Sequence, residues 1–294
     1  EIANSGKVDG KRYITDKAGC LNKWSIVETS RGIYFIDNIN SSISIFNGSV
    51  QSLSDAKGFK AWIGRNNSTD LWTPKNFDNF ISFWDRVNDD VYFLRGSDIE
   101  DYNVLCYNEQ TQQFSSFYNY GQVPMMVNLQ DRFVAFKDNS LWEQGEGQYN
   151  NIFGNLQEYH ILYRITPDPY GDKIFTNLEY RADIFDMSKT GEDANPYMPL
   201  NGVITGETFD TLSVWNEYQG NEVHVQFSIK DTYPDKRRKF RIWRMDIPRD
   251  KKSADNPHGL NRIRNPWIYL KLSRTPTIPD ERMEFHDLAV RYYE

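Results

Sequence analysis

The sequence predicts an all-β protein: an N-terminal hairpin-repeat module, partly propeller-like, followed by an antiparallel β-sandwich. Three observations lead to this class. A hairpin phrase recurs through the first half of the chain. Aromatic residues make up 15% of the 294 residues, and strands favour aromatic and β-branched side chains. Helical periodicity is poor throughout, and the best helical candidate is residues 73–82, where Pro74 suits a first helical position.

The hairpin phrase consists of an apolar run, a turn rich in Asn and Asp, and a return strand. It occurs at 32–37 with 42–46, at 90–94 with 104–107 and 114–117, and at 131–136 with 140–143. Asn and Asp suit such turns because they tolerate left-handed backbone and bond their own main chain. Hairpins recurring about every 40–60 residues are typical of stacked blades. We therefore assign residues 1–155 to a hairpin-repeat module, although this length holds three blades and propellers use about four to eight.

Longer alternating runs begin near residue 156, and residues 156–294 are assigned to the sandwich. The expected strands are 159–166, 173–186, 212–218, 222–230, 239–247, 267–273 and 283–293. Seven runs separated by Gly, Pro, Asn and Asp clusters are typical of a β-sandwich. In the last run the apolar alternation changes parity, which predicts a bulge near Asp287. Two long loops, 187–208 and 248–266, are expected to be contact arms.

Composition limits the classes of function. The net charge of −7 argues against tight phosphate-driven binding of nucleic acid. No apolar run has the length of a membrane-spanning helix, so membrane insertion is not expected, and the sequence contains no secretory signal. Because the first residue is Glu1, we expect a processed product or a fragment of a longer chain. Cys20 and Cys106 permit one disulfide but no framework, and Cys106 is expected to be a buried structural thiol.

Motifs for catalysis or cofactor binding are lacking in the sequence. The four histidines His160, His224, His258 and His286 do not stand at metal-ligand spacing, and there is no Cys-x-x-Cys. The sequence also has no Gly-x-Ser-x-Gly elbow, phosphate-binding loop or EF-hand loop. We expect no enzyme, no cofactor and no metal. Carboxylates at 89–90 and 100–101 could form a glycosidase pair, but both lie in predicted turns, where acids usually serve the turn itself.

Basic residues gather in the sandwich and form the candidate contact site. The candidate subunit contacts are Arg237, Arg238, Lys239, Arg241, Arg249, Lys251 and Lys252. The simplest interpretation is a solvated hairpin and its outward face. The alternative is electrostatic contact with an acidic neighbour such as another copy of this chain, because the planar guanidinium of Arg grips carboxylates in pairs.

Several segments resemble the C-terminal part of the muzzle-type tail structural proteins of crAss-like bacteriophages. The resemblance lies in residues 32–37, 114–121, 173–183 and 262–272. It implies a virion component of the phage tail that forms a homo-oligomer ring around the DNA channel and contacts other tail proteins. It supplies no catalytic residue.

The expected function is thus assembly of the wall or exit gate of the DNA channel, without specific binding of nucleic acid. A negative chain suits such a channel because like charge prevents passing DNA from adhering. Two rival functions remain open. One is a carbohydrate-active or carbohydrate-binding protein built from a propeller and a sandwich, and the other is an adhesin for host polysaccharide.

Overall fold

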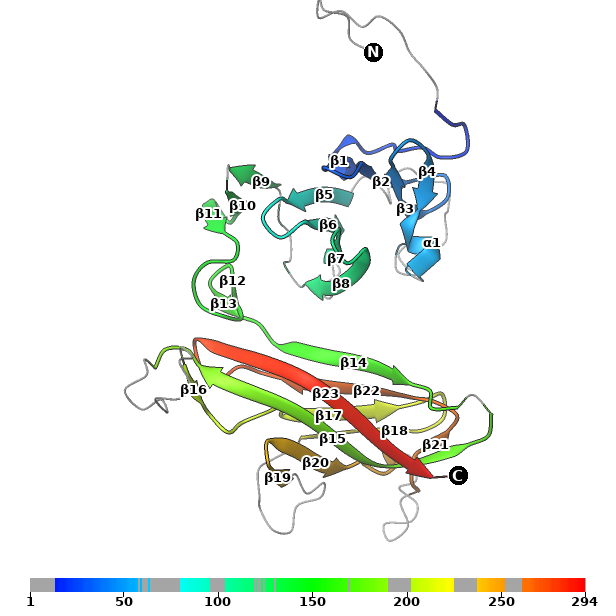
Figure 1. The fold of residues 1–294 in the computed structure, drawn as a ribbon, viewed down its shortest axis with the longest axis vertical. Coiled ribbons are helices and arrows are strands. Elements are labelled where there is room, and N and C mark those ends of the chain that lie inside the picture. Colours follow the sequence, from blue (N-terminus) through cyan, green and yellow to red (C-terminus); the bar gives the residue numbers. More distant parts are fainter. Residues whose placement is uncertain are drawn as a thin grey trace, which may run out of the picture. The chain divides into compact units, whose positions relative to one another are not determined.

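The computed structural model describes most of the chain and divides it into two compact units, Glu1–Glu146 and Gly147–Glu294 (Figure 1). The described residues are 14–57, 59, 63, 80–95, 104–118, 120, 123, 125–129, 131–168, 170–189, 202–224, 237–251 and 261–293. The sequence suggests a boundary at 155/156, and the compact units meet at 146/147. Within the described residues no helix is long and apolar enough to span a membrane.

The described part of the first unit consists of three successive antiparallel meanders (Figure 1). The first sheet contains β1 (Val27–Glu28), β2 (Ile33–Asp37), β3 (Ser42–Phe46) and β4 (Val50–Ser52), flanked by η1 (Lys23–Ser25) and α1 (Leu53–Lys57). The second contains β5 (Phe80–Asp85), β6 (Asp90–Arg95), β7 (Val104–Asn108) and β8 (Gln113–Tyr118). The third contains β9 (Met125–Leu129), β10 (Arg132–Lys137) and β11 (Ser140–Glu143). The expected hairpins are therefore present, and the described part of the unit is almost entirely β.

The same turn closes two of these hairpins. Asp37 ends β2, and its Oδ1 accepts from the backbone N–H groups of Ile39 and Asn40 at 3.0 and 3.3 Å. Asp85 ends β5, and its Oδ1 accepts in the same way from the backbone N–H groups of Val87 and Asn88 at 2.9 and 3.4 Å. In each turn the fourth residue after the Asp has positive φ, 50° at Ser41 and 56° at Asp89. A buried Asp thus serves turn chemistry at both places.

The first two sheets share one core. Tyr34 of β2 lies 6.4 Å from the ring of Phe93 in β6 and 5.8 Å from that of Tyr107 in β7, centroid to centroid. The same buried cluster includes Ile36, Ile43, Ile45, Ile63, Phe80, Val91 and Leu105. Aromatic pairs at these distances add to the stabilisation from burying their area. The sheets are therefore packed as one body by side chains from successive hairpins.

Polar side chains also join successive sheets. Asn22 donates from Nδ2 to the carbonyl of Phe80 at 2.7 Å, which joins the segment before η1 to β5. Asn128 of β9 donates to the carbonyl of Trp84 at 2.6 Å and accepts from the backbone N–H of Arg86 at 3.0 Å. Since each bond uses a backbone group at or beside a strand end, these asparagines fix the position of one sheet against the next.

The second unit is an antiparallel sandwich (Figure 1). One sheet, the F sheet, has the order β14 (Tyr159–Ile165), β22 (Ile268–Arg274), β17 (Thr211–Trp215) and β18 (Gly220–His224). The other, the G sheet, centres on β15 (Lys173–Asp186), which pairs with β16 (Val203–Ile204), β20 (Ile242–Asp246), β21 (Arg264–Asn265) and β23 (Glu281–Tyr293). Strand β19 (Arg237–Lys239) pairs with β20, and a small hairpin joins β12 (Asn151–Ile152) to β13 (Asn155–Leu156).

Alternating residues of the two sheets fill the sandwich core. Leu178, Tyr180 and Ala182 of β15 are buried against Leu270 and Leu272 of β22 in one cluster. The largest buried side chain, Trp243 of β20, donates from its indole nitrogen to the carbonyl of Ala182 at 3.0 Å. Its only polar atom is thereby satisfied.

Several strand predictions are confirmed and two need correction. The 173–186 strand has the expected ends, and the bulge near Asp287 is present because the pairing with β15 passes from Asp287 to Phe285 and skips His286. The expected strand 239–247 is wrong as one strand, since Phe240 and Arg241 have positive φ and turn the chain between β19 and β20. The helix expected at 73–82 is wrong where described, because Phe80 already begins β5, and the remainder lies outside the described residues.

Candidate interaction surfaces

The predicted contact residues lie on and after the β19–β20 hairpin of the sandwich. Arg237, Arg238 and Lys239 form β19, whose backbone pairs with Arg244, Trp243 and Ile242 of β20. Arg249 and Lys251 follow β20, half-buried and exposed respectively. Lys252 lies outside the described residues. The structure therefore brings the first four predicted residues together on one hairpin and places two others farther along the chain.

Arg241 is held against its own sheet. Its Nε donates to Oδ1 of Asp183 at 3.3 Å, and its Nη2 donates to Oδ2. Hydrogen bonding to this buried carboxylate raises the pKa of Arg241 above its usual value. His286 approaches the same carboxylate, with Nε2 3.6 Å from Oδ2. Asp183 thus anchors both the basic hairpin and the bulge of β23.

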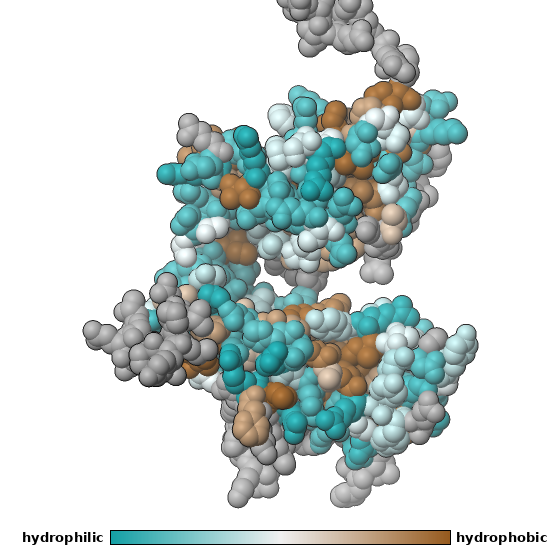
Figure 2. Space-filling model, in the orientation of Figure 1, coloured by the Kyte–Doolittle hydropathy of each residue, from teal (hydrophilic) through white to brown (hydrophobic). Residues whose placement is uncertain are grey.

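Further ion pairs lie on the outer face of the G sheet, and hydrophilic residues are interspersed with apolar ones on the visible face of this unit (Figure 2). Glu179 of β15 contacts Arg244 of β20 at 3.2 Å and Arg291 of β23 at 2.8 Å. Arg181 contacts Asp287 at 3.3 Å. The arginine and aspartate side chains in these pairs are about half exposed or more, and exposed pairs contribute little stability. These ion pairs therefore add little to the stability of the sheet. The alternating charges that they place on its outer face are of the kind that gives specificity to contacts with a partner.

The tip of the basic hairpin presents an aromatic ring. Phe240 is 85% exposed, the highest value among the exposed large apolar side chains of the described residues. Its φ is 53°, and Arg241 follows with 63°. A bulky residue with positive φ is uncommon and disfavoured sterically. Phe240 thus combines a highly exposed ring with a sterically disfavoured backbone conformation.

A groove of about 490 Å³ lies on the sandwich between β14 and β23. Its apolar lining includes Tyr163 and Ile165 of β14 and Phe285, Leu288 and Val290 of β23. Among the described pairings, β14 pairs only with β22 and β23 only with β15, so both walls of the groove are sheet edges. Open sheet edges are places where another chain can be added.

The buried end of the same sandwich holds an ionic network. Arg274 of β22 donates to Glu281 of β23 and to Glu207, and the hydroxyl of Tyr159 donates to Oε1 of Glu281 at 2.9 Å. Glu281 is buried and Tyr159 half-buried, and burial together with this carboxylate raises the pKa of Tyr159. We interpret the network as structural, because it joins strands of the two sheets.

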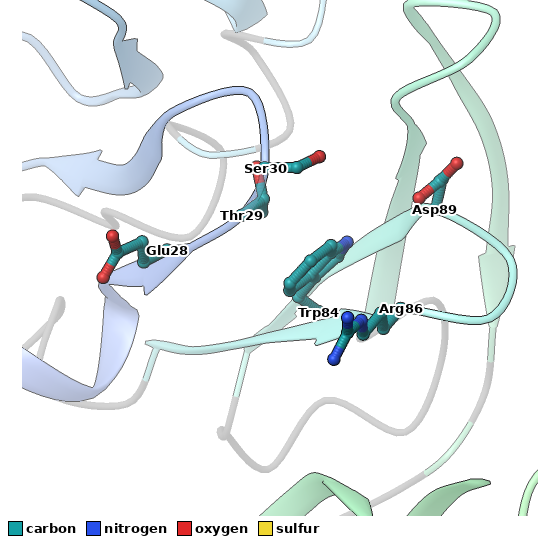
Figure 3. Close-up of a pocket in the computed structure, with 6 residues that line it drawn as sticks. All are labelled: Glu28, Thr29, Ser30, Trp84, Arg86 and Asp89. Atoms are coloured by element: carbon teal, nitrogen blue, oxygen red, sulfur yellow. The ribbon is translucent and has the colours of Figure 1, made fainter. Parts of the chain in front are cut away.

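A second hollow, of about 540 Å³, lies in the first unit between the β1–β2 turn and the β5–β6 hairpin. Figure 3 shows Trp84 between Glu28 and Thr29 on one side and Arg86 and Asp89 on the other; Ser30 also lines the hollow. The indole nitrogen of Trp84 is buried and has no hydrogen-bond partner among the described residues. The hollow thus places an aromatic ring beside two carboxylates and a guanidinium.

Two of the carboxylates that could form a glycosidase pair are described, and both lie at the β5–β6 turn: Asp89 is in the turn and Asp90 begins β6. Asp89 holds positive φ, and Oδ1 of Asp90 accepts from Asn108 at 2.9 Å. Residues 100–101 lie outside the described residues. His286 contacts Asp183, and in the part of the chain that the structure describes no three metal-binding side chains gather.

Neither Phe240, the groove nor the Trp84 hollow was predicted from the sequence. The basic run 236–239 lies in the sequence directly before Phe240. An aromatic residue directly after such a run was the one sequence signal that could have indicated an exposed ring at this turn. The groove has no local signal, because its two walls are more than 100 residues apart in the chain.

The described parts of both units consist almost entirely of antiparallel β-sheet, which defines a β-rich protein. Comparison with known proteins identifies the family. Residues 1–139 match the family model of the Crassvirus muzzle protein, and residues 147–250 match that of the Crassvirus muzzle protein C-terminal domain. The chain is 43% identical over all of its 294 residues to the Muzzle protein of Bacteroides phage crAss001. The chain therefore belongs to the crassvirus muzzle protein family, and it spans 20% of the length of that relative.

Proposed function

We propose that this chain is a structural component of the virion, located in the phage tail, where its copies form part of the wall or exit gate of the DNA channel. The observation that carries the proposal is the 43% identity with a muzzle protein across the whole chain. The partners would be further copies in a ring and neighbouring tail proteins. No catalytic step is proposed.

The physical properties of the chain support this role. Antiparallel sheets fixed by inter-sheet hydrogen bonds, such as those of Asn22 and Asn128, make rigid units. The net charge of −7 repels a passing polyanion and reduces adhesion of DNA to the wall. The exposed sheet edges at β14 and β23 offer places for contact between subunits.

The test is to locate the chain in purified virions. Peptides from residues 14–293 should be found by mass spectrometry in density-purified particles, and antibodies against this chain should label the tail in electron micrographs. A capsid-specific antibody provides the control for labelling position. Absence of the peptides from particles, or label confined to the capsid, would contradict the proposal.

A second candidate function, carbohydrate binding, is favoured by the Trp84 hollow. Trp84 would stack on a sugar ring while Glu28 and Asp89 accept from its hydroxyls. A glycan array should then give specific binding that is lost in Trp84→Ala and kept in Trp24→Ala, which removes an indole that is 64% exposed outside the hollow. Absence of binding to any glycan, or equal loss in both variants, would exclude this candidate.

A further inference from the structure

The sandwich carries an apolar projection at one side of the G sheet and an apolar groove at the other. The projection is Phe240, between β19 and β20. The groove lies along β23, beside β14. A strand has two hydrogen-bonding edges, and β20 and β23 both pair with the same residues of β15, so they must occupy opposite edges.

Projection and groove also lie at the same level along the strands. Ile242, the second residue after Phe240, is opposite Arg181 of β15. Arg181 is in turn opposite Asp287, which lines the groove. A second copy of the unit displaced sideways in the sheet plane would therefore bring its hairpin turn close to this groove without a shift along the strands.

The groove is large enough to admit a phenyl ring, and much of its lining is apolar. A volume of about 490 Å³ lies within the range of about 300–1,000 Å³ found for ligand pockets. The lining residues Leu288 and Val290 are half-buried members of the sandwich core. An inserted phenylalanine would cover core side chains that are now in contact with water, which is the usual driving force at the centre of an interface.

The charges at the two features differ, because the hairpin is basic whereas the groove carries charges of both signs. The hairpin has three consecutive basic residues in β19, followed by Arg241. Asp287 lines the groove, and Glu284 precedes it on β23. Arg164 also lines the groove, with its guanidinium over the Trp267 ring at 5.1 Å, and Asp287 is paired with Arg181 at 3.3 Å. Burial of apolar area, more than charge, would therefore drive the contact.

We propose that the β19–β20 hairpin of one copy inserts Phe240 into the β14–β23 groove of the next copy. The contact is heterologous, so one side of each copy serves one neighbour and the opposite side serves another. Contacts of this kind generate rings when the rotation closes. The inference rests on the proposed function, since it supplies the contact by which copies would form the channel wall.

The first experiment measures self-association of the full 294-residue chain by analytical ultracentrifugation. The unaltered chain should associate as its concentration rises. Phe240→Ala should raise the dissociation constant for self-association by about 30-fold or more, as expected when an interface anchor is truncated. Tyr170→Ala, which removes an aromatic ring that is 81% exposed in another turn, should have no effect. Thermal unfolding of both alanine variants checks that they fold. Phe240→Leu keeps an apolar side chain at this position and should retain most of the self-association.

The second experiment tests the direction of the contact. Phe240→Asp removes the projection and leaves the groove, while Tyr163→Asp charges the groove and leaves the projection. Each variant alone should be monomeric. Mixed together they should form a 1:1 dimer and nothing larger, because only one productive contact remains. A two-fold contact between identical surfaces would not give this result.

Three results would overturn the inference: a monomeric unaltered chain at all concentrations, association of Phe240→Ala equal to that of the unaltered chain, or no dimer in the mixture. Each of them leaves the virion assignment intact if the chain is still found in tails. Conversely, absence of the chain from virions would contradict the proposed function even if the Phe240 contact forms in solution.

Discussion

Arg274 and Glu281 form a two-pronged ion pair inside the sandwich. Nε and Nη2 of the arginine donate to Oε1 and Oε2 of the glutamate at 3.0 and 2.8 Å. The glutamate side chain is fully buried and that of the arginine is 6% exposed. Because the two residues lie on β22 and β23, the pair joins the F sheet to the G sheet near the start of the last strand.

Removing one charge of this pair should strongly destabilise the chain. Glu281→Gln keeps the volume but leaves the Arg274 guanidinium buried without its main counter-charge, so the free energy of unfolding should fall by about 3–5 kcal/mol. Urea denaturation measures this loss. Glu284→Gln, in the partly exposed pair with Arg282, should cost about 1 kcal/mol or less. Equal losses in the two variants would contradict a structural role for the buried pair.

The repeated Asp turn gives a second prediction. Asp85→Ala removes the acceptor of two backbone N–H groups and of the Asn88 side chain, so the free energy of unfolding should fall by about 1–3 kcal/mol. Asp131→Ala, at an exposed turn position, should change it by less than about 0.5 kcal/mol. Thermal denaturation of both variants measures the difference. A neutral Asp85→Ala would show that the turn forms without its side chain.

Asn128 should control the attachment of the third sheet to the second. Asn128→Ala removes both hydrogen bonds to the β5–β6 hairpin. Amides of β9 and β10 should then exchange with solvent about 5–30 times faster, which corresponds to about 1–2 kcal/mol of lost local stability. Hydrogen–deuterium exchange with mass spectrometry reports this region separately. Asn47→Ala, at an exposed turn position, is the control, and unchanged exchange in β9 would refute the role of Asn128.

Cys106 should be unreactive in the folded chain. Burial raises the pKa of its thiol to about 12, so almost no thiolate is present at pH 8. Both cysteines are free, and the half-exposed Cys20 should react with a thiol reagent while Cys106 reacts only after denaturation. Labelling of Cys20→Ser measures Cys106 alone. Rapid labelling of this folded variant at pH 8 would contradict the burial.

The same pKa predicts how stability depends on pH. The folded state holds the Cys106 proton to about pH 12, whereas the unfolded chain releases it near the ordinary thiol pKa of about 8.5. The unfolded state therefore binds fewer protons above that pH, and the free energy of unfolding should fall as pH rises from about 8.5 towards 12. Cys106→Ala should reduce this slope relative to the unaltered chain.

Local patterns predicted much of the fold. The alternation from residue 173 to 186 defines β15 because its inward residues, such as Leu178 and Tyr180, repeat with the period of a strand. Asn and Asp marked the hairpin turns because their side chains bond the adjacent backbone. The parity change near Asp287 located the bulge for the same geometric reason.

The errors and omissions arise where distant residues decide the structure. The turn at Phe240 was missed because an aromatic residue followed by Arg disfavours positive φ, and only the surrounding sheet enforces it. The burial of Glu281 depends on Arg274 and Tyr159, which reach it from two other strands. The contact site was predicted as a set of basic residues, whereas the groove that we propose as their counterpart needs two strands from different sheets.

The most direct test of the central claim is a cryo-electron microscopy reconstruction of the tail in purified virions. The account predicts several copies of two all-β units around the DNA channel, with the sequence of this chain fitting their density and Phe240 of each copy seated in the β14–β23 groove of its neighbour. A tail whose density contains no part of this chain, or contains it as isolated copies that do not touch, would contradict the account.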